Sequence, residues 1–124
     1  MVDIEAFWQA VLRQDPKVLH TFFCDNAYVN WHCTNEHFTV EEFIRANCEY
    51  PSQWDGVLER IEIIDNLIIT VARIHSKKQD LSFHAVSFIQ TQEDKICGID
   101  EYWGDDGPAP QWRLDKHIGI PIHP

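Results

Sequence analysis

The spacing of apolar residues changes once along this chain, and this change restricts the fold more than any other feature. Before residue 50, apolar side chains recur every three or four residues, which is typical of helices with one buried face. After residue 56, apolar and polar side chains alternate, which is typical of strands in a half-buried sheet. Helices followed by consecutive strands indicate an α+β fold, in which the helices pack on one face of a curved antiparallel sheet.

The boundaries of these elements follow from local signals. A first helix is expected over residues 4–12, and Asp15-Pro16 opens a second that ends near residue 26. Thr39 and Glu42 have the spacing of a capping box, which predicts a third helix from residue 40 to Cys48. Residues 27–33 are predicted to form a first short strand. Four further strands, joined by short polar connections, are predicted over residues 57–64, 67–75, 81–91 and 95–103.

Length and charge limit the kind of protein. A chain of 124 residues with 44% hydrophobic residues is large enough for one domain, which we expect over residues 1–113 with a C-terminal extension over residues 114–124. The formal charge of −10 argues against nucleic acid and anionic membranes as partners. No signal peptide, membrane-spanning run or zinc spacing is visible, and the four cysteines show no C-x-x-C pattern. We therefore expect a cytoplasmic protein with reduced thiols and no metal site.

Four passages together resemble a known superfamily. They are DNAYVNW at residues 25–31, Trp54, SFHAVSF at residues 82–88 and EYWGDD at residues 101–106. With the order of helices and strands, they resemble the SnoaL-like branch of the nuclear transport factor 2-like superfamily over residues 4–113. The resemblance implies a cone-shaped sheet wrapped around the N-terminal helices, with a pocket between them. The superfamily includes ketosteroid isomerases, dehydratases, polyketide cyclases, epoxide hydrolases and binding modules, so no single activity is implied.

Side chains alternate across a strand, so the register decides which of them line this pocket. Placing the family's pattern on the strands points Glu101 inward on the last strand and His84 inward on the strand before it. The same placement, with the aromatic residues of the chain, gives the candidates for ligand binding: Val29, Trp31, Trp54, Val86, Phe88 and Trp103.

His84 and Glu101 form the candidate catalytic pair. Inward residues of adjacent antiparallel strands can lie within hydrogen-bond reach. Burial would raise the pKa of the carboxyl group and a neighbouring imidazolium would lower it, so the pair could move a proton on a small substrate. The alternative is that the two side chains only satisfy each other in a polar cavity.

The chain departs from ketosteroid isomerases at the positions that matter for their chemistry. Trp31 stands where those enzymes carry the proton-abstracting acid, and Phe7 and Val86 stand where they carry hydrogen-bond donors. The resemblance therefore does not imply their reaction.

Three functions stay open. The main expectation is a module that binds a small hydrophobic or amphipathic molecule, without a cofactor. The second is a cofactor-independent isomerase, cyclase or dehydratase-type enzyme that uses Glu101 and His84 as acid and base. The third is a dimeric interaction protein whose pocket is filled by side chains. A cavity below roughly 300 Å³ would disfavour the first two functions.

The outer face of the sheet is also informative. Ile63, Ile69, Val71 and Phe83 are expected there, and they make this face more apolar than an exposed surface normally is. An apolar sheet face without covering helices indicates a partner, and the commonest partner is a second copy of the same chain. We expect a homodimer through this face.

Overall fold

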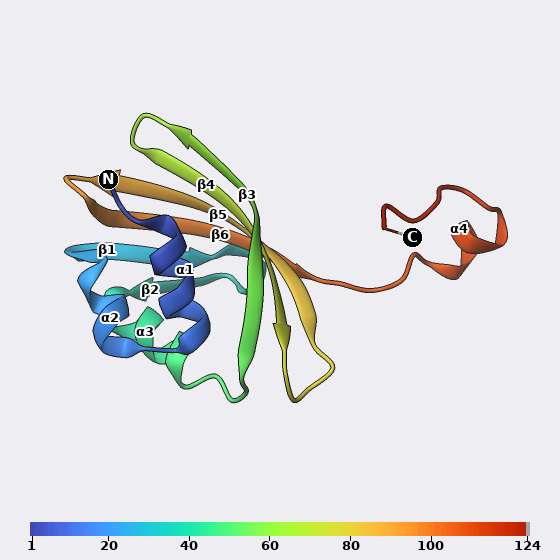
Figure 1. The fold of residues 1–124 in the computed structure, drawn as a ribbon, viewed down its shortest axis with the longest axis horizontal. Coiled ribbons are helices and arrows are strands. Elements are labelled where there is room, and N and C mark those ends of the chain that lie inside the picture. Colours follow the sequence, from blue (N-terminus) through green and yellow to red (C-terminus); the bar gives the residue numbers. More distant parts are fainter. Residues whose placement is uncertain (124) are drawn as a thin grey trace.

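Three helices pack on the concave side of one strongly curved sheet in the computed structural model, which describes residues 1–123 (Figure 1). The helices are α1 (Ile4–Arg13), α2 (Pro16–Thr21) and α3 (Val40–Cys48). Asp3 caps α1 and Asp15 caps α2 through their side chains. The predicted capping box is present, because Thr39 and Glu42 bond to each other's backbone N–H groups.

Six strands form the sheet, in the spatial order β2-β1-β6-β5-β4-β3. Their bounds are β1 (Phe23–Trp31), β2 (Glu36–Thr39), β3 (Trp54–Ile64), β4 (Leu67–Ser76), β5 (Ser82–Gln92) and β6 (Lys95–Asp105). The last four strands form the predicted antiparallel meander. β1 and β6 run parallel, so the sheet is mixed and not wholly antiparallel as expected. The α+β fold class itself is confirmed.

The structure differs from the prediction most between α2 and α3. α2 ends at Thr21, and Phe23 already belongs to β1. The backbone N–H of Ile96 donates to the Phe22 carbonyl at 2.8 Å, so the chain joins β6 at once. A short 3-10 helix (His32–Thr34) and the edge strand β2 were not predicted. The edge strand β2 pairs with β1, and a local pattern does not show this pairing.

The core lies between the helices and the concave face of the sheet. Phe7 of α1 packs edge-on against Phe22 and Phe23, with ring centroids 5.5 Å and 5.8 Å away. Leu19 of α2 and Ile89 of β5 are completely buried. Burying these apolar side chains stabilises the arrangement of helices and sheet. The helices leave one part of the concave face uncovered.

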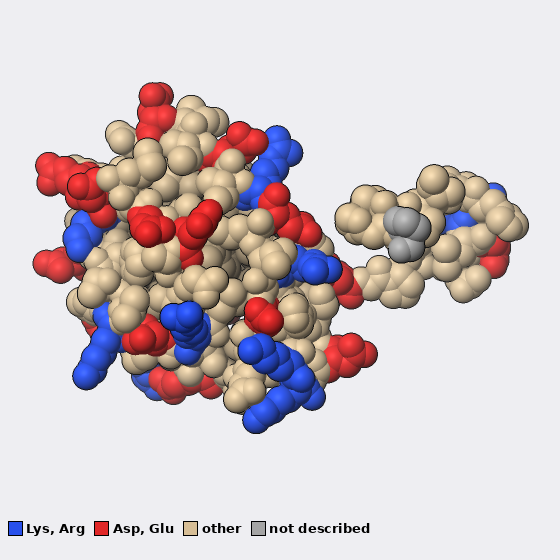
Figure 2. Space-filling model, in the orientation of Figure 1, with Lys and Arg blue, Asp and Glu red and all other residues tan. Residues whose placement is uncertain are grey.

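The end of the chain projects away from this body. Asp106 still donates its backbone N–H to the Ser82 carbonyl at 2.9 Å, but residues 107–123 form an arm that reaches outward (Figures 1 and 2). The arm contains one short helix, α4 (Gln111–Asp115). Five large apolar side chains of this C-terminal arm are about half or more exposed: Trp112, Leu114, Ile118, Ile120 and Ile122.

Candidate functional site

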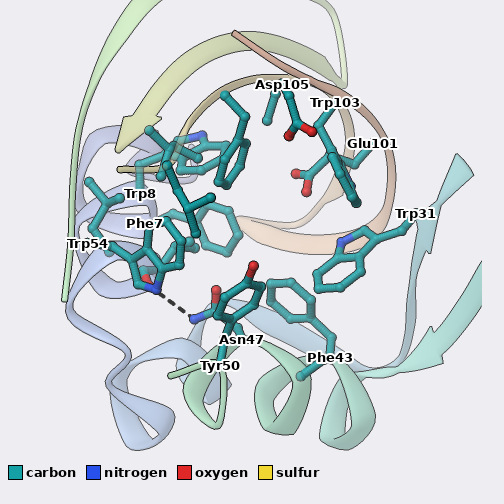
Figure 3. A pocket seen from close by; sticks show the side chains of 17 residues that line it. Phe7, Trp8, Trp31, Phe43, Asn47, Tyr50, Trp54, Glu101, Trp103 and Asp105 are labelled. Atoms are coloured by element: carbon teal, nitrogen blue, oxygen red, sulfur yellow. Dashed lines mark hydrogen bonds between the residues drawn. The ribbon is translucent and has the colours of Figure 1, made fainter. Parts of the chain in front are cut away.

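A cavity lies between the concave face of the sheet and the helices α1 and α3, and Figure 3 shows its lining. Its volume is about 150 Å³. Seventeen residues line it, and most of them are aromatic or aliphatic. Tyr50 and Leu81 in the lining are 47% and 42% exposed, whereas Phe7 and Trp8 are buried. The cavity is therefore small, apolar and partly open to solvent.

Three of the tryptophans predicted for the pocket line this cavity: Trp31 from β1, Trp54 from β3 and Trp103 from β6. The ring of Phe83 lies between two of them, 5.8 Å from Trp54 and 6.1 Å from Trp103. Trp31 packs edge-on against Phe43 of α3 at 6.3 Å. Because each ring is held by another ring, the lining is suited to a flat apolar molecule.

Glu101 brings a carboxyl group into this apolar lining. Its register partner on β5 is Ser87, whose hydroxyl donates a hydrogen bond of 2.6 Å to Glu101 Oε2. Burial raises the pKa of Glu101 above its usual value, and the hydrogen bond from Ser87 offsets this only in part. Glu101 therefore holds a proton more readily than an ordinary surface glutamate.

The residue beside Glu101 on the neighbouring strand is Trp31. Trp31 and Glu101 are register partners on the parallel strands β1 and β6, so both side chains are on the concave face. In Figure 3 the nitrogen of Trp31 is on the side of the indole that faces Glu101. Within residues 1–123, Trp31 Nε1 is the one buried side-chain nitrogen or oxygen without a hydrogen-bond partner. A buried donor left unpaired costs about 1–3 kcal/mol.

The register predicted for β5 is wrong by one residue. The side chains of this strand that face inward include Ala85, Ser87 and Ile89, which are all buried. The residues predicted to face inward lie on the outer face instead: His84, Val86 and Phe88. The physical reason is space, because the small side chains of Ala85 and Ser87 leave room for the cavity and for the Glu101 carboxyl group. His84 and Glu101 therefore lie on opposite faces, and the predicted catalytic pair does not form.

Three other placements also differ from expectation. Val29 is completely buried in the core and does not line the cavity. Phe83, expected outside, lines the cavity. Ile63 pairs with the buried Ile68 and so lies on the concave side of the sheet.

His84 has a different set of partners on the outer face. Its Nδ1 bonds to Asp106 and its Nε2 lies 3.0 Å from Glu59 Oε1. The hydrogen bond with Asp106 raises the pKa of His84 above its usual value, although burial acts in the opposite direction. The Ser82 hydroxyl also donates to Asp106, at 2.6 Å. These contacts hold the start of β5 against the end of β6 and do not reach the cavity.

The described residues offer little for a metal or a charged cofactor. Across residues 1–123, no group of three or more His, Cys, Asp or Glu side chains is arranged to hold a metal ion. The acids of the cavity lining are Glu101 and Asp105, and neither a histidine nor a cysteine lines the cavity beside them. Among the described helices, none is long and apolar enough to cross a lipid bilayer.

These elements and this cavity define a class: a curved sheet closed on one side by helices, with a pocket that opens between them. The sequence matches no family model and no curated protein. Solved structures do match the fold. A candidate ketosteroid isomerase from Kribbella flavida has a TM-score of 0.80 at 14% identity, covering 97% of this chain and 88% of that one.

Two further structures give the same result. An NTF2-like protein of unknown function from Burkholderia xenovorans has a TM-score of 0.76 at 22% identity, covering 95% of this chain and 92% of that one. A candidate SnoaL-like polyketide cyclase from Shewanella putrefaciens has a TM-score of 0.67 at 13% identity, covering 91% and 80%. At these identities the likeness concerns the fold alone. The chain has the nuclear transport factor 2-like fold, and its resemblance to SnoaL-like proteins is confirmed at that level.

Several residues of the site were not predicted from the sequence. Ser87, which donates a hydrogen bond to Glu101, was missed because it stands between Val86 and Phe88, and the apolar pattern favours turning those two inward. Trp8 and Phe43 were assigned to helices but not to the pocket. The signal for them was available, since both lie on the apolar faces of amphipathic helices that pack on the sheet.

Proposed function

We propose that this protein binds a compact, largely apolar molecule in the cavity between the sheet and the helices, without an assigned catalytic step. The observation that carries the proposal is the lining: fixed aromatic rings surround a single buried carboxyl group and a single unpaired indole N–H. A mostly apolar cavity with a few polar groups directed into it is the usual form of a small-molecule site.

The size of the cavity limits the ligand. About 150 Å³ is half of the smallest volume expected for a site that binds a drug-sized ligand. So small a volume also favours the third function, in which side chains fill the pocket. A dry apolar cavity of this size is nonetheless known to hold a benzene ring. The proposal is therefore restricted to molecules built on one ring, with substituents that reach toward Tyr50 and Leu81.

The enzyme alternative loses its main support. It required His84 beside Glu101, and the two side chains lie on opposite faces of the sheet. Glu101 by itself is one carboxyl group with one serine partner, which is not a set of acid and base.

The test is a binding screen with single-ring compounds, followed by protein-observed NMR. Ala85→Leu is the informative variant, because Ala85 is 1% exposed and lines the cavity, so three added carbon atoms occupy the space of the ligand. Val86→Leu, one residue away on the outer face, is the matched control. We expect the first variant to abolish binding and the second to preserve it. Absence of any single-ring ligand at millimolar concentration would contradict the proposal.

We further propose that the chain forms a homodimer through the outer face of the sheet and the C-terminal arm. Ile69, Val71 and Phe88 of the outer face have no covering helix. The arm exposes its own apolar residues, with Ile120 and Ile122 about 90% exposed. Arg113 and Lys116 against Asp115 give the arm one net positive charge, while the whole chain carries −10, so the charges of arm and body favour contact.

Light scattering after size-exclusion chromatography tests the dimer. Replacing Ile120 and Ile122 by Asp puts charge on the arm without touching the core, and we expect a monomer. Ile63→Asp is the control, since it adds a charge at a half-exposed isoleucine on the other side of the sheet, and we expect it to stay dimeric. A wild-type protein that is monomeric at every concentration would rule the dimer out.

A cytoplasmic location belongs to the same proposal. The four cysteines are unpaired thiols in the structure, which is the state favoured in a reducing compartment.

A further inference from the structure

The Trp31 indole N–H is a donor that the protein itself leaves without a partner. Within the described residues it is alone in this respect among buried side-chain polar atoms. The indole of Trp8, which also lines the cavity, shows the ordinary arrangement: its Nε1 donates to the Thr70 hydroxyl at 3.2 Å. Buried polar groups in native structures are nearly always paired, so an exception in the wall of a cavity points to a partner that enters the cavity.

The indole is not free to turn away and find another partner. Its ring packs edge-on against Phe38 of β2 at a centroid distance of 4.7 Å and against Phe43 of α3 at 6.3 Å. Phe38 and Phe43 are themselves buried. The direction of the N–H group is therefore fixed by packing before any ligand arrives.

The Glu101 carboxyl group supplies a second polar group at the same place. Its Oε2 is occupied by the Ser87 hydroxyl, and Ser87 is completely buried. Its Oε1 has no hydrogen bond to another described residue. Since burial favours the protonated acid, the hydroxyl of that acid can donate from Oε1 into the cavity. Figure 3 shows the Glu101 carboxyl group and the Trp31 nitrogen directed to the same part of the cavity.

We propose that Trp31 and Glu101 form one subsite for the acceptor oxygen of a compact, uncharged aromatic carbonyl compound. The inference rests on the proposed binding function and adds the chemical class of the ligand. The carbonyl oxygen accepts from the Trp31 N–H and from the Glu101 hydroxyl, and its two lone pairs match two converging donors. The ring of the ligand lies against the aromatic lining.

Two properties of the site exclude neighbouring classes. A carboxylate ligand would bring a second negative charge into a cavity that also contains Asp105, in a chain with a formal charge of −10. A polycyclic ketone does not fit a cavity of about 150 Å³. A hydrocarbon of the right size fits, but it leaves the Trp31 N–H unpaired.

Three probes with nine non-hydrogen atoms each separate these possibilities. Acetophenone has the carbonyl group, α-methylstyrene replaces the carbonyl oxygen by a CH₂ group of similar shape, and benzoate is an anion. Dissociation constants are measured at pH 6 by titration of the wild-type protein, and the indole N–H signals are followed by ¹H–¹⁵N NMR. We expect acetophenone to bind roughly 10- to 100-fold more tightly than α-methylstyrene, and to shift the Trp31 indole signal most.

Substitutions test whether Trp31 and Glu101 cause the preference for acetophenone over α-methylstyrene. Trp31→Phe keeps a ring but removes the N–H, and we expect acetophenone to lose its advantage over α-methylstyrene. Trp8→Phe is the matched control, because it removes an indole N–H that the protein already satisfies. Trp8 also lines the cavity, so we expect both affinities to change but their ratio to be preserved. Glu101→Gln keeps an uncharged donor and is expected to retain the preference, whereas Glu101→Met is expected to reduce it. Thermal unfolding checks that each variant is folded.

The outcomes separate this inference from the proposed function. Equal binding of acetophenone and α-methylstyrene, or an unchanged preference in Trp31→Phe, overturns the subsite and leaves a purely apolar binding cavity. Tightest binding of benzoate overturns the uncharged ligand class. Failure of all three probes to bind overturns the subsite and the proposed function together.

Discussion

Asp100 and Glu101 are neighbours on β6, yet their carboxyl groups lie on opposite faces of the sheet and in opposite chemical surroundings. Asp100 faces outward, where hydrogen bonds from His32 and Asn30 outweigh the effect of burial and lower its pKa. Glu101 faces the cavity, where burial dominates and its pKa is raised. The same residue chemistry thus serves as a charged anchor on one face and as a proton-holding group on the other.

The largest expected contrast between the two faces is in packing. Ile89→Ala removes a completely buried side chain of the concave face, and we expect the free energy of unfolding to fall by about 2–5 kcal/mol. Phe88→Ala removes more atoms at the next position but from the outer face, where 36% of the residue is exposed, so a smaller loss is expected. Urea denaturation of both variants makes the comparison, and equal losses would show that the two faces are equally packed.

A second contrast lies within the outer face. A Cβ atom added at Gly98 would come within 2.6 Å of the Tyr28 ring, which stacks on His37 at 5.9 Å and has to move. We expect Gly98→Ala to cost about 1–3 kcal/mol of unfolding free energy. Gly104→Ala on the same strand is the control, because nothing lies within 4 Å of the added atom. Denaturation midpoints that shift equally in both variants would contradict the crowding at Gly98.

The charge state of Glu101 predicts a pH dependence of stability. Above its usual value of 4.5, the unfolded chain loses the Glu101 proton while the folded protein keeps it, so stability falls as pH rises toward the raised folded pKa. The slope from this one group is at most about 1.4 kcal/mol per pH unit. Glu101→Gln keeps the shape and removes the titration. Subtracting its unfolding free energy from that of the wild type, from pH 4 to pH 8, isolates the effect, and a flat difference would refute it.

The smallest expected effect belongs to His84. Its pKa is raised in the folded protein, so its contribution to stability is fully present below its usual value of 6.5 and is lost as pH rises through the folded pKa. Since His84 is partly exposed, we expect His84→Gln to lose less than about 1 kcal/mol at pH 5.5 and less still at pH 8.5. Ligand affinity should not change, because His84 is outside the cavity. A loss of binding in this variant would reopen the pairing with Glu101.

The sequence predicted the inward-facing residues correctly on one strand and wrongly on its neighbour. On β6 the residues that face inward, Glu101 and Trp103, were predicted, because the passage around them carries the resemblance to a known superfamily. On β5 both faces contain apolar residues, so alternation alone does not distinguish them. The inward residues beside the cavity and the Glu101 carboxyl group are small, Ala85 and Ser87, so the outer residues Val86 and Phe88 have the more apolar pattern.

The remaining differences are long-range effects. The parallel pairing of β1 with β6 joins residues from the two ends of the domain, and no local pattern encodes it. The unpaired N–H of Trp31 is likewise visible only in three dimensions, since it depends on what packs around the indole.

That parallel pairing has a consequence for the order in which the protein can fold during synthesis. β1 emerges early, but its partner across the sheet is β6, whose residues Ile96–Glu101 are among the last of the body to be made. Until then the core residues Phe23 and Val29 lack the strand beside them, and the apolar faces of α1 and α3 have no complete sheet to cover. Closing so long a loop is slow, and the half-made domain exposes apolar surface meanwhile. The hairpins of β3 to β6 can assemble locally. The sheet is therefore completed last, when β6 pairs with β1.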